Sequence, residues 1–134
     1  MNYWLVKSDP ETYGWAEFSK DKKTSWDGVR NYAARIHLKG MKKDDLVLFY
    51  HSNTDAGVVG IAKVIKEFYQ DPTTEDTAWV SVGLEYEKPL KKPVSLAAIK
   101  AEKNLKDIPL IKIGRLSVMP LKKEDFELIV KMGS

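Results

Sequence analysis

The apolar run from Leu46 to Tyr50 is the feature that most constrains the fold of this chain. Two aspartates precede it at positions 44 and 45, and the polar segment 52–55 follows it. An uninterrupted apolar run of this length between turn signals is typical of a strand that is buried on both faces. The run is also far too short to span a bilayer. The sequence therefore predicts a buried strand over residues 45–51.

Further patterns along the chain predict one α+β domain that occupies residues 1–134. Turn residues between positions 53 and 57 predict an antiparallel hairpin that joins the buried strand to a second strand over 58–67. Apolar and polar residues alternate from 80 to 86, which predicts a half-buried strand. The other expected strands cover residues 2–7 and 116–119, and the expected helices cover residues 28–38, 96–103 and 122–132.

The segment from Trp26 to Arg35 carries the strongest functional signal. Asp27 is a good N-cap for the helix expected over 28–38. Trp26 precedes that helix, and Asn31 and Arg35 share a polar face of it. An aromatic ring beside guanidinium and amide donors suits a planar or anionic ligand such as a nucleotide, and a capped surface helix with an anchoring Trp is the alternative. The expected buried stripe has helical spacing and consists of Val29, Tyr32, Ala33 and Ile36.

Charge is distributed unevenly, although the formal net charge is only +3. Residues 20–43 carry eight basic side chains against two carboxylates, and residues 88–123 carry ten against two. Between them, residues 67–87 carry six carboxylates and no Lys or Arg. Solvated charge is the simplest interpretation, but one positive face would steer a polyanion onto the protein. The residues expected on that face are Lys20, Lys22, Lys23, Lys42, Lys43, Lys112 and Arg115.

Catalytic and metal chemistry find little support in the sequence. The chain has no Cys, which excludes disulfides, thiolate zinc sites and cysteine nucleophiles. His37 and His51 lack a metal-ligand spacing, and the glycines at 57 and 60 lack the Lys-Ser/Thr of a P-loop. We therefore expect a protein that is not an enzyme and binds no cofactor or metal. The N-terminus lacks a signal-peptide pattern, so we expect a cytoplasmic protein without a membrane partner.

Four segments together resemble the EVE domain family, a branch of the PUA-like fold. They are YWLVKSDP at residues 3–10, WDGVRNYAAR at 26–35, LVLFYHSN at 46–53 and GRLSV at 114–118. The resemblance extends over nearly the whole chain. It implies a PUA-like mixed β-barrel of about five to six strands flanked by short helices.

The resemblance also implies non-catalytic binding of nucleic acid, with a modified (5-substituted) cytosine in DNA as the expected ligand. Related PUA-like folds such as the YTH and SRA domains hold a flipped base in an aromatic pocket. Trp26 and Tyr50 are then expected to flank the base, and three arginines to hold adjacent phosphates, namely Arg30, Arg35 and Arg115. The polar base edge is expected to meet Lys7, Ser8, Asn31 and Ser52, and the expected ligand-binding set is completed by His51 and Ser117.

Two other functions stay open at this point. An RNA-binding module is one, because no residue pattern distinguishes a 2′-OH, although the resemblance favours DNA. The other is an enzyme that binds a small molecule or modified nucleoside, for which His51 is the only titratable candidate. Ala33 and Ile36 stand where many family members carry Gln and Asn, so the selectivity of this chain is open. We expect a monomer.

Overall fold

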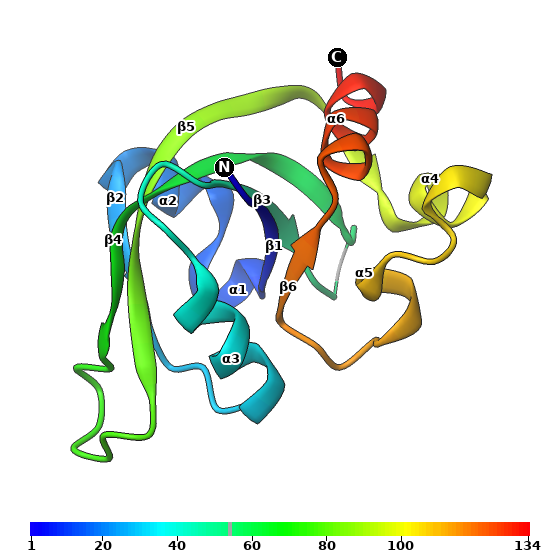
Figure 1. Ribbon diagram of the computed structural model, residues 1–134. Coiled ribbons are helices and arrows are strands. Elements are labelled where there is room, and N and C mark those ends of the chain that lie inside the picture. The colour runs from blue at the N-terminus through cyan, green and yellow to red at the C-terminus, as the bar shows by residue number, and fades with distance from the viewer. Residues whose placement is uncertain (54) are drawn as a thin grey trace.

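A curved six-stranded sheet with short helices on both faces forms the protein (Figure 1), as seen in the computed structural model, which describes residues 1–53 and 55–134. The strand order is β2-β5-β4-β3-β1-β6, in which β1 and β3 run parallel and the other neighbours antiparallel. The strands are β1 (Tyr3–Ser8), β2 (Lys23–Trp26), β3 (Leu46–His51), β4 (Gly57–Gln70), β5 (Val80–Ser95) and β6 (Val118–Leu121). The helices are α1 (Pro10–Tyr13), α2 (Trp15–Asp21), α3 (Tyr32–Gly40), α4 (Leu96–Ala101), the 3-10 turn η1 (Lys103–Leu105), α5 (Pro109–Lys112) and α6 (Lys123–Met132).

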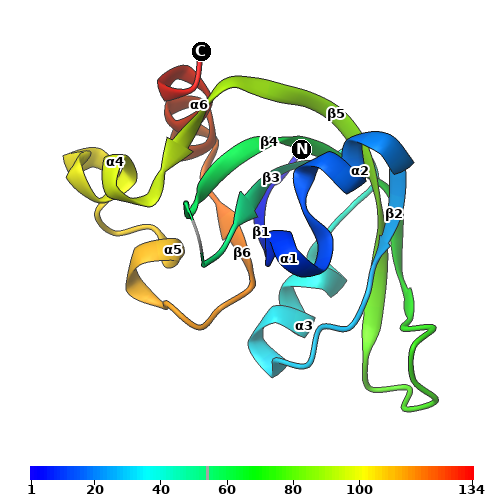
Figure 2. The same cartoon turned by 180° about the vertical axis from the view of Figure 1, so that it is seen from behind.

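The sheet is not closed into a barrel. The two edge strands, β2 and β6, have four residues each, and within residues 1–53 and 55–134 neither pairs with the other. Figure 2 shows them on different sides of the molecule, with β4 and β5 arching between. The α+β prediction with about five to six strands and short helices is confirmed, whereas the predicted PUA-like mixed β-barrel is not, because the sheet stays open.

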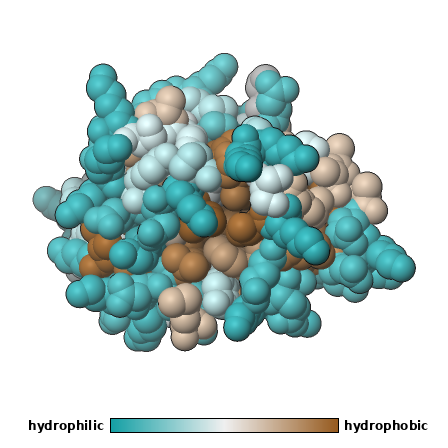
Figure 3. Space-filling model, turned by 90° about the horizontal axis from the view of Figure 1, so that it is seen from above, coloured by the Kyte–Doolittle hydropathy of each residue, from teal (hydrophilic) through white to brown (hydrophobic). Residues whose placement is uncertain are grey.

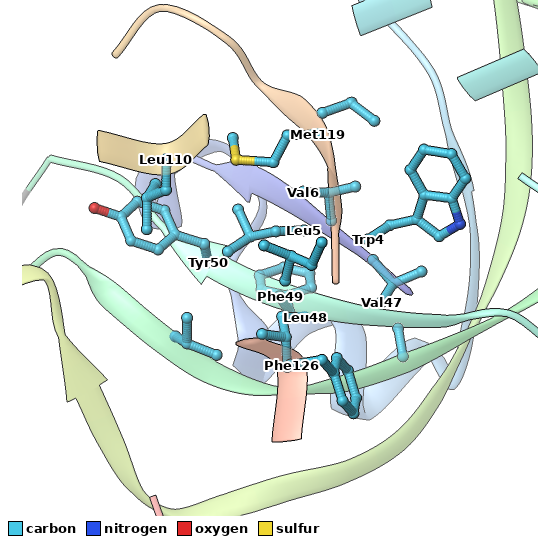
Figure 4. Packing of buried hydrophobic residues seen from close by; sticks show 14 of the residues in the cluster. Trp4, Leu5, Val6, Val47, Leu48, Phe49, Tyr50, Leu110, Met119 and Phe126 are labelled. Carbon is cyan, nitrogen blue, oxygen red and sulfur yellow. The ribbon is translucent and has the colours of Figure 1, made fainter. Parts of the chain in front are cut away.

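β3 lies in the hydrophobic core and is buried on both faces, as predicted from its apolar run. On one face Phe49 stacks against Phe18 of α2, with ring centroids 5.4 Å apart. On the other face Tyr50 lies beside Leu110 of α5, and Phe126 of α6 packs near β1 (Figure 4). The β3–β4 pair forms the predicted antiparallel hairpin. The half-buried strand predicted at 80–86 is wrong in one respect, because residues 80–84 of β5 are buried on both faces.

Asp45 is a buried carboxylate with a structural role. Its side chain is hydrogen-bonded to the indole Nε1 of Trp4 at 2.9 Å and to the backbone N–H groups of Asn2 and Lys42. Three donors satisfy a charge that would be costly to bury alone. The carboxylate thereby joins β1 to the turn that precedes β3.

The helix predicted over 28–38 begins later, and its buried face differs from the predicted stripe. α3 starts at Tyr32, and Asn31 is its N-cap, with a side chain that accepts from the N–H of Ala34 at 2.9 Å. Asp27 caps no helix, because Gly28 follows it in a left-handed conformation with φ of 75°. The buried residues of α3 are Ala34 and Leu38, whereas Tyr32 and Ile36 are 65% and 62% exposed.

The face of the molecule seen from above is mostly hydrophilic (Figure 3). Figure 3 shows charged and polar side chains around the face seen from above, with an apolar strip at its centre. In the part of the chain that the structure describes, no helix has the length and apolar character needed to cross a membrane.

Candidate functional site

A cavity of about 470 Å³ opens at the carboxyl end of β1, between α1, the end of β2 and the loop that leads to α3. Two other cavities, of about 500 and 530 Å³, flank the start of α6 and contain none of the predicted site residues. The first is therefore the candidate site. It is lined by Lys7, Ser8, Asp9, Thr12, Tyr13, Thr24, Ser25, Trp26, Asp27, Gly28, Val29, Arg30 and Ser117.

Trp26 and Tyr13 form the aromatic wall of this pocket. The two rings meet edge to face, with centroids 6.5 Å apart and an interplanar angle of 76°. Trp26 also contacts Phe49 of the core edge to face at 5.4 Å and is only 8% exposed. Trp26 is the last residue of β2, and it is both a core residue and a wall of the pocket.

The polar groups of the pocket include both donors and acceptors. Lys7 supplies an ammonium group whose pKa is lowered by burial, and its Nζ donates to the carbonyl of Gly114 at 2.9 Å. Asp9 and Asp27 supply carboxylates to the lining. Burial raises the pKa of Asp27, and the charge of Asp71 adds to the rise. Such a lining can bind a ligand that is itself both donor and acceptor.

Arg30 lines the pocket, but its guanidinium is already held by the protein. Its Nη1 lies 2.9 Å from the carboxylate of the fully buried Asp71, and its Nη2 donates to Thr73 at 3.0 Å. Burial raises the pKa of Asp71, but hydrogen bonds from Thr73, Arg30 and the N–H of Gly28 outweigh this effect and keep the pKa well below its usual range. Arg30 is therefore a fixed positive wall with little freedom to follow a phosphate.

Arg35 lies outside the pocket and holds the loop between β4 and β5. Its guanidinium carbon lies 5.0 Å from the ring centroid of Tyr32 and 5.6 Å from that of Trp79. One Nη donates to the carbonyl of Ala78 at 3.0 Å. The predicted phosphate contact by Arg35 has no support from this arrangement, because the guanidinium is used within the fold.

Five other predicted site residues do not line the pocket. Asn31 caps α3, and Tyr50 is 3% exposed in the core below Lys7, whose Nζ lies 5.9 Å from its ring centroid. The Nε2 of His51 accepts from the N–H of Trp15 at 2.9 Å, and the N–H of Ser52 donates to the carbonyl of Ser8. Arg115 is exposed beside Gly114, at the edge of the pocket.

The sequence predicted only some of the residues that line this pocket. The predicted residues that do line the pocket are Lys7, Ser8, Trp26, Arg30 and Ser117. The sequence prediction did not assign Thr12, Tyr13, Thr24 or Ser25 to the site, because a four-residue helix and a short edge strand leave little periodic signal. It also assigned Asp27 to a helix N-cap and not to the pocket. The signal that could have indicated α1 is Asp9-Pro10, an N-cap followed by Pro at the first helical position.

The predicted single basic face is not formed. β2, which begins at Lys23, and the turn after α5, which ends at Lys112, lie on opposite sides of the molecule in both Figure 1 and Figure 2. Several of these cations also face carboxylates, as in the pairs Lys23–Glu85, Lys42–Glu67 and Lys112–Asp107. Positive charge at the pocket therefore comes from Lys7, Arg30 and the nearby Arg115.

Comparison with known proteins gives concordant matches over nearly the whole chain. The model of the EVE domain family matches residues 2–132. Thymocyte nuclear protein 1 of Mus musculus is 34% identical over 167 aligned residues, which cover 98% of this chain and 73% of that protein.

Solved structures also match over nearly the whole chain. The NMR structure of a protein from Rhodopseudomonas palustris is 44% identical, has a TM-score of 0.94 and covers 99% of this chain and 93% of its own. The crystal structure of human THYN1 protein in complex with 5-methylcytosine containing DNA is 29% identical, with a TM-score of 0.91. That match covers 100% of this chain and 98% of the human one.

Proposed function

This chain belongs to the EVE domain family, and from that premise we propose that it is a non-catalytic DNA-binding domain that holds a 5-substituted cytosine in the pocket beside Trp26. The observation that carries the proposal is the lining of the pocket, which joins an aromatic wall to donors and acceptors in a volume typical of small-ligand sites. The DNA complex of the human relative supports the choice of ligand class.

The polar groups of the pocket complement the edge of cytosine. Cytosine presents an exocyclic amino donor beside ring nitrogen and carbonyl acceptors, and aspartate is a suitable acceptor for that amino group. Asp27 and Asp9 supply carboxylates, while Lys7 supplies an ammonium donor. A 5-methyl group is apolar and gains from contact with Trp26 or Val29, which line the same cavity. The base must leave the duplex to reach these groups, and their contacts offset that cost.

The geometry of His51 weighs against the enzyme alternative. His51 is not part of the pocket lining, and its Nε2 accepts from the N–H of Trp15. A general base must reach the proton that it removes. His51 is instead a positioning group for the start of α2, so we infer binding without catalysis.

The first test is a binding titration with matched oligonucleotides. Wild-type protein is titrated with duplexes that differ only in cytosine or 5-methylcytosine at one position, and with an RNA of the same sequence. We expect the tightest binding to the duplex with 5-methylcytosine. Equal affinity for the two duplexes would overturn the modified-base proposal, and tighter binding to the RNA would overturn the choice of DNA.

The second test removes one acceptor from the pocket. Asp27→Ala should lower affinity for the modified duplex about tenfold to a hundredfold, since a good base contact contributes roughly 1–3 kcal/mol of discrimination. Asp27 is exposed, so the fold should persist. Glu127→Ala is the control, because it removes an exposed carboxylate from α6, a helix that contributes no residue to the pocket lining. Equal affinities of the two variants would show that Asp27 does not contact the base.

A further inference from the structure

A rigid turn beside the pocket exposes an isoleucine. Ile113 follows α5 and is 52% exposed. Its N–H donates to the carbonyl of Pro109 at 2.8 Å, and its own carbonyl accepts from the N–H of Leu116 at 3.0 Å. Leu110 and Leu116 are buried on either side of the turn and anchor it in the core. The side chain of Ile113 is therefore presented to solvent from a fixed backbone.

The turn is fastened directly to the pocket. The Nζ of Lys7, which lines the pocket, donates to the carbonyl of Gly114 at 2.9 Å, and the N–H of Lys7 donates to the carbonyl of Ser117 at 2.9 Å. Ile113 is the residue before Gly114 and Arg115 is the residue after it. An apolar side chain and a guanidinium consequently flank the contact that closes this edge of the pocket.

Base extrusion leaves a gap in the base stack that an exposed apolar side chain can fill. A base that leaves the duplex breaks its stacking, and proteins that distort DNA often insert an apolar side chain, isoleucine included, into the base stack. Arg115, two residues after Ile113, is an exposed cation that suits a phosphate beside such a gap, whereas Lys112 on the other side is paired with Asp107. Tyr32 is a poorer candidate, because its exposed ring already packs against Trp79 at 5.1 Å and under the guanidinium of Arg35.

We propose that Ile113 is the wedge that fills the space in double-stranded DNA beside the nucleotide held in the pocket. The proposal rests on the proposed function, since it requires that a base enters the pocket from a duplex. It adds to that function that the ligand is double-stranded DNA and that two parts of the protein have different roles. The pocket selects the base, and Ile113 stabilises the duplex from which the base has been taken.

The test compares Ile113→Ala with Ile36→Ala on two DNA ligands. Ile36 is a matched control, because it is the same residue type at 62% exposure on α3 and does not line the pocket. One ligand is a fully paired duplex with 5-methylcytosine, and the other places the same base opposite an abasic site, where it is already unpaired. Ile113→Ala should weaken binding to the paired duplex on the order of tenfold and leave binding to the unpaired ligand nearly unchanged, because a paired base must be unstacked only in the first.

A fluorescent reporter gives a second readout. 2-Aminopurine next to the modified base should brighten when wild-type protein or Ile36→Ala binds, and should brighten less with Ile113→Ala at saturation. Equal losses on both ligands, or no loss on either, would overturn the wedge while leaving the pocket proposal intact. Wild-type protein that does not distinguish 5-methylcytosine from cytosine would overturn the proposed function, and the wedge with it.

Discussion

At the scale of single residues, Trp26 shows how one side chain can serve the core and the pocket together. Its ring is 8% exposed, packs edge to face on Phe49 and also lines the cavity. Removing a buried aromatic ring costs about 3–5 kcal/mol of stability. An alanine at this position would therefore change folding as well as binding, which is why Asp27 gives the cleaner test of the pocket.

Gly28 gives a prediction at the same scale. It has φ of 75°, and a Cβ added there would meet no atom within 4 Å, so only the backbone conformation opposes a side chain. Gly28→Ala should lower the free energy of unfolding by about 1 kcal/mol, because an L-residue in the left-handed region is strained by roughly 1–2 kcal/mol. Gly114→Ala is the control, since Gly114 also has open space but lacks a positive φ. Urea unfolding measures both, and equal stabilities of the two variants would contradict the strain argument.

At the scale of elements, the longer strands were predictable, whereas β2 and the start of α3 were not. Apolar runs and turn residues sufficed for β1, β3 and the β3–β4 hairpin, because local pattern and burial agree there. The start of α3 depends on Asp71, which lies 43 residues beyond Gly28 and accepts its N–H at 2.8 Å while holding Arg30. Such a distant contact leaves no periodic trace in the local sequence. Arg30 is held by Asp71, and Arg35 is held separately by the carbonyl of Ala78. Both partners are distant in sequence, so local sequence could not show that these arginines are already used within the fold.

The contact between β3 and α2 gives a prediction on pH. His51 of β3 accepts the N–H of Trp15, the first residue of α2, and therefore must keep its Nε2 unprotonated. Burial lowers the pKa of His51 from 6.5, against the opposing charge of Glu17. The unfolded chain then binds a proton more readily than the folded one. The stability that the unprotonated His51 contributes is fully present above pH 6.5, and it is lost as the pH falls through the pKa of His51 in the folded protein.

Thermal unfolding between about pH 7.5 and about pH 5 measures this effect. The wild type should lose stability as pH falls, and His51→Gln should lose less over the same interval. His37→Gln is the comparison, since burial also lowers the pKa of His37 but the ring accepts no hydrogen bond from α2. Hydrogen exchange of the Trp15 amide should accelerate in His51→Gln and not in His37→Gln. Identical exchange in the two variants would show that His51 does not hold the start of α2.

At the scale of the whole molecule, the basic side chains are dispersed, whereas the sequence predicted that they form one positive face. β2 and α5, which carry parts of the two basic stretches, lie on opposite sides of the molecule (Figure 1, Figure 2), and three of the lysines are paired with carboxylates. The electrostatic part of DNA binding therefore depends on a small set of cations around the pocket. The linear charge pattern could not indicate this, because it does not show which basic side chains lie beside carboxylates in the fold.

The dependence of DNA affinity on salt tests this view of the molecule. Each neutralised phosphate contributes about −0.9 to the slope of log K against log salt, so about two to four contacts predict a slope of roughly −2 to −4. Arg115→Ala should make the slope shallower by about 1 and weaken modified and unmodified duplexes alike, because a phosphate contact carries no base information. Lys42→Ala is the matched control, since Lys42 faces Glu67 and does not line the pocket, and it should leave the slope unchanged. A much steeper slope, with equal losses in the two variants, would mean that DNA reaches both basic stretches and that the pocket is not the centre of the interface.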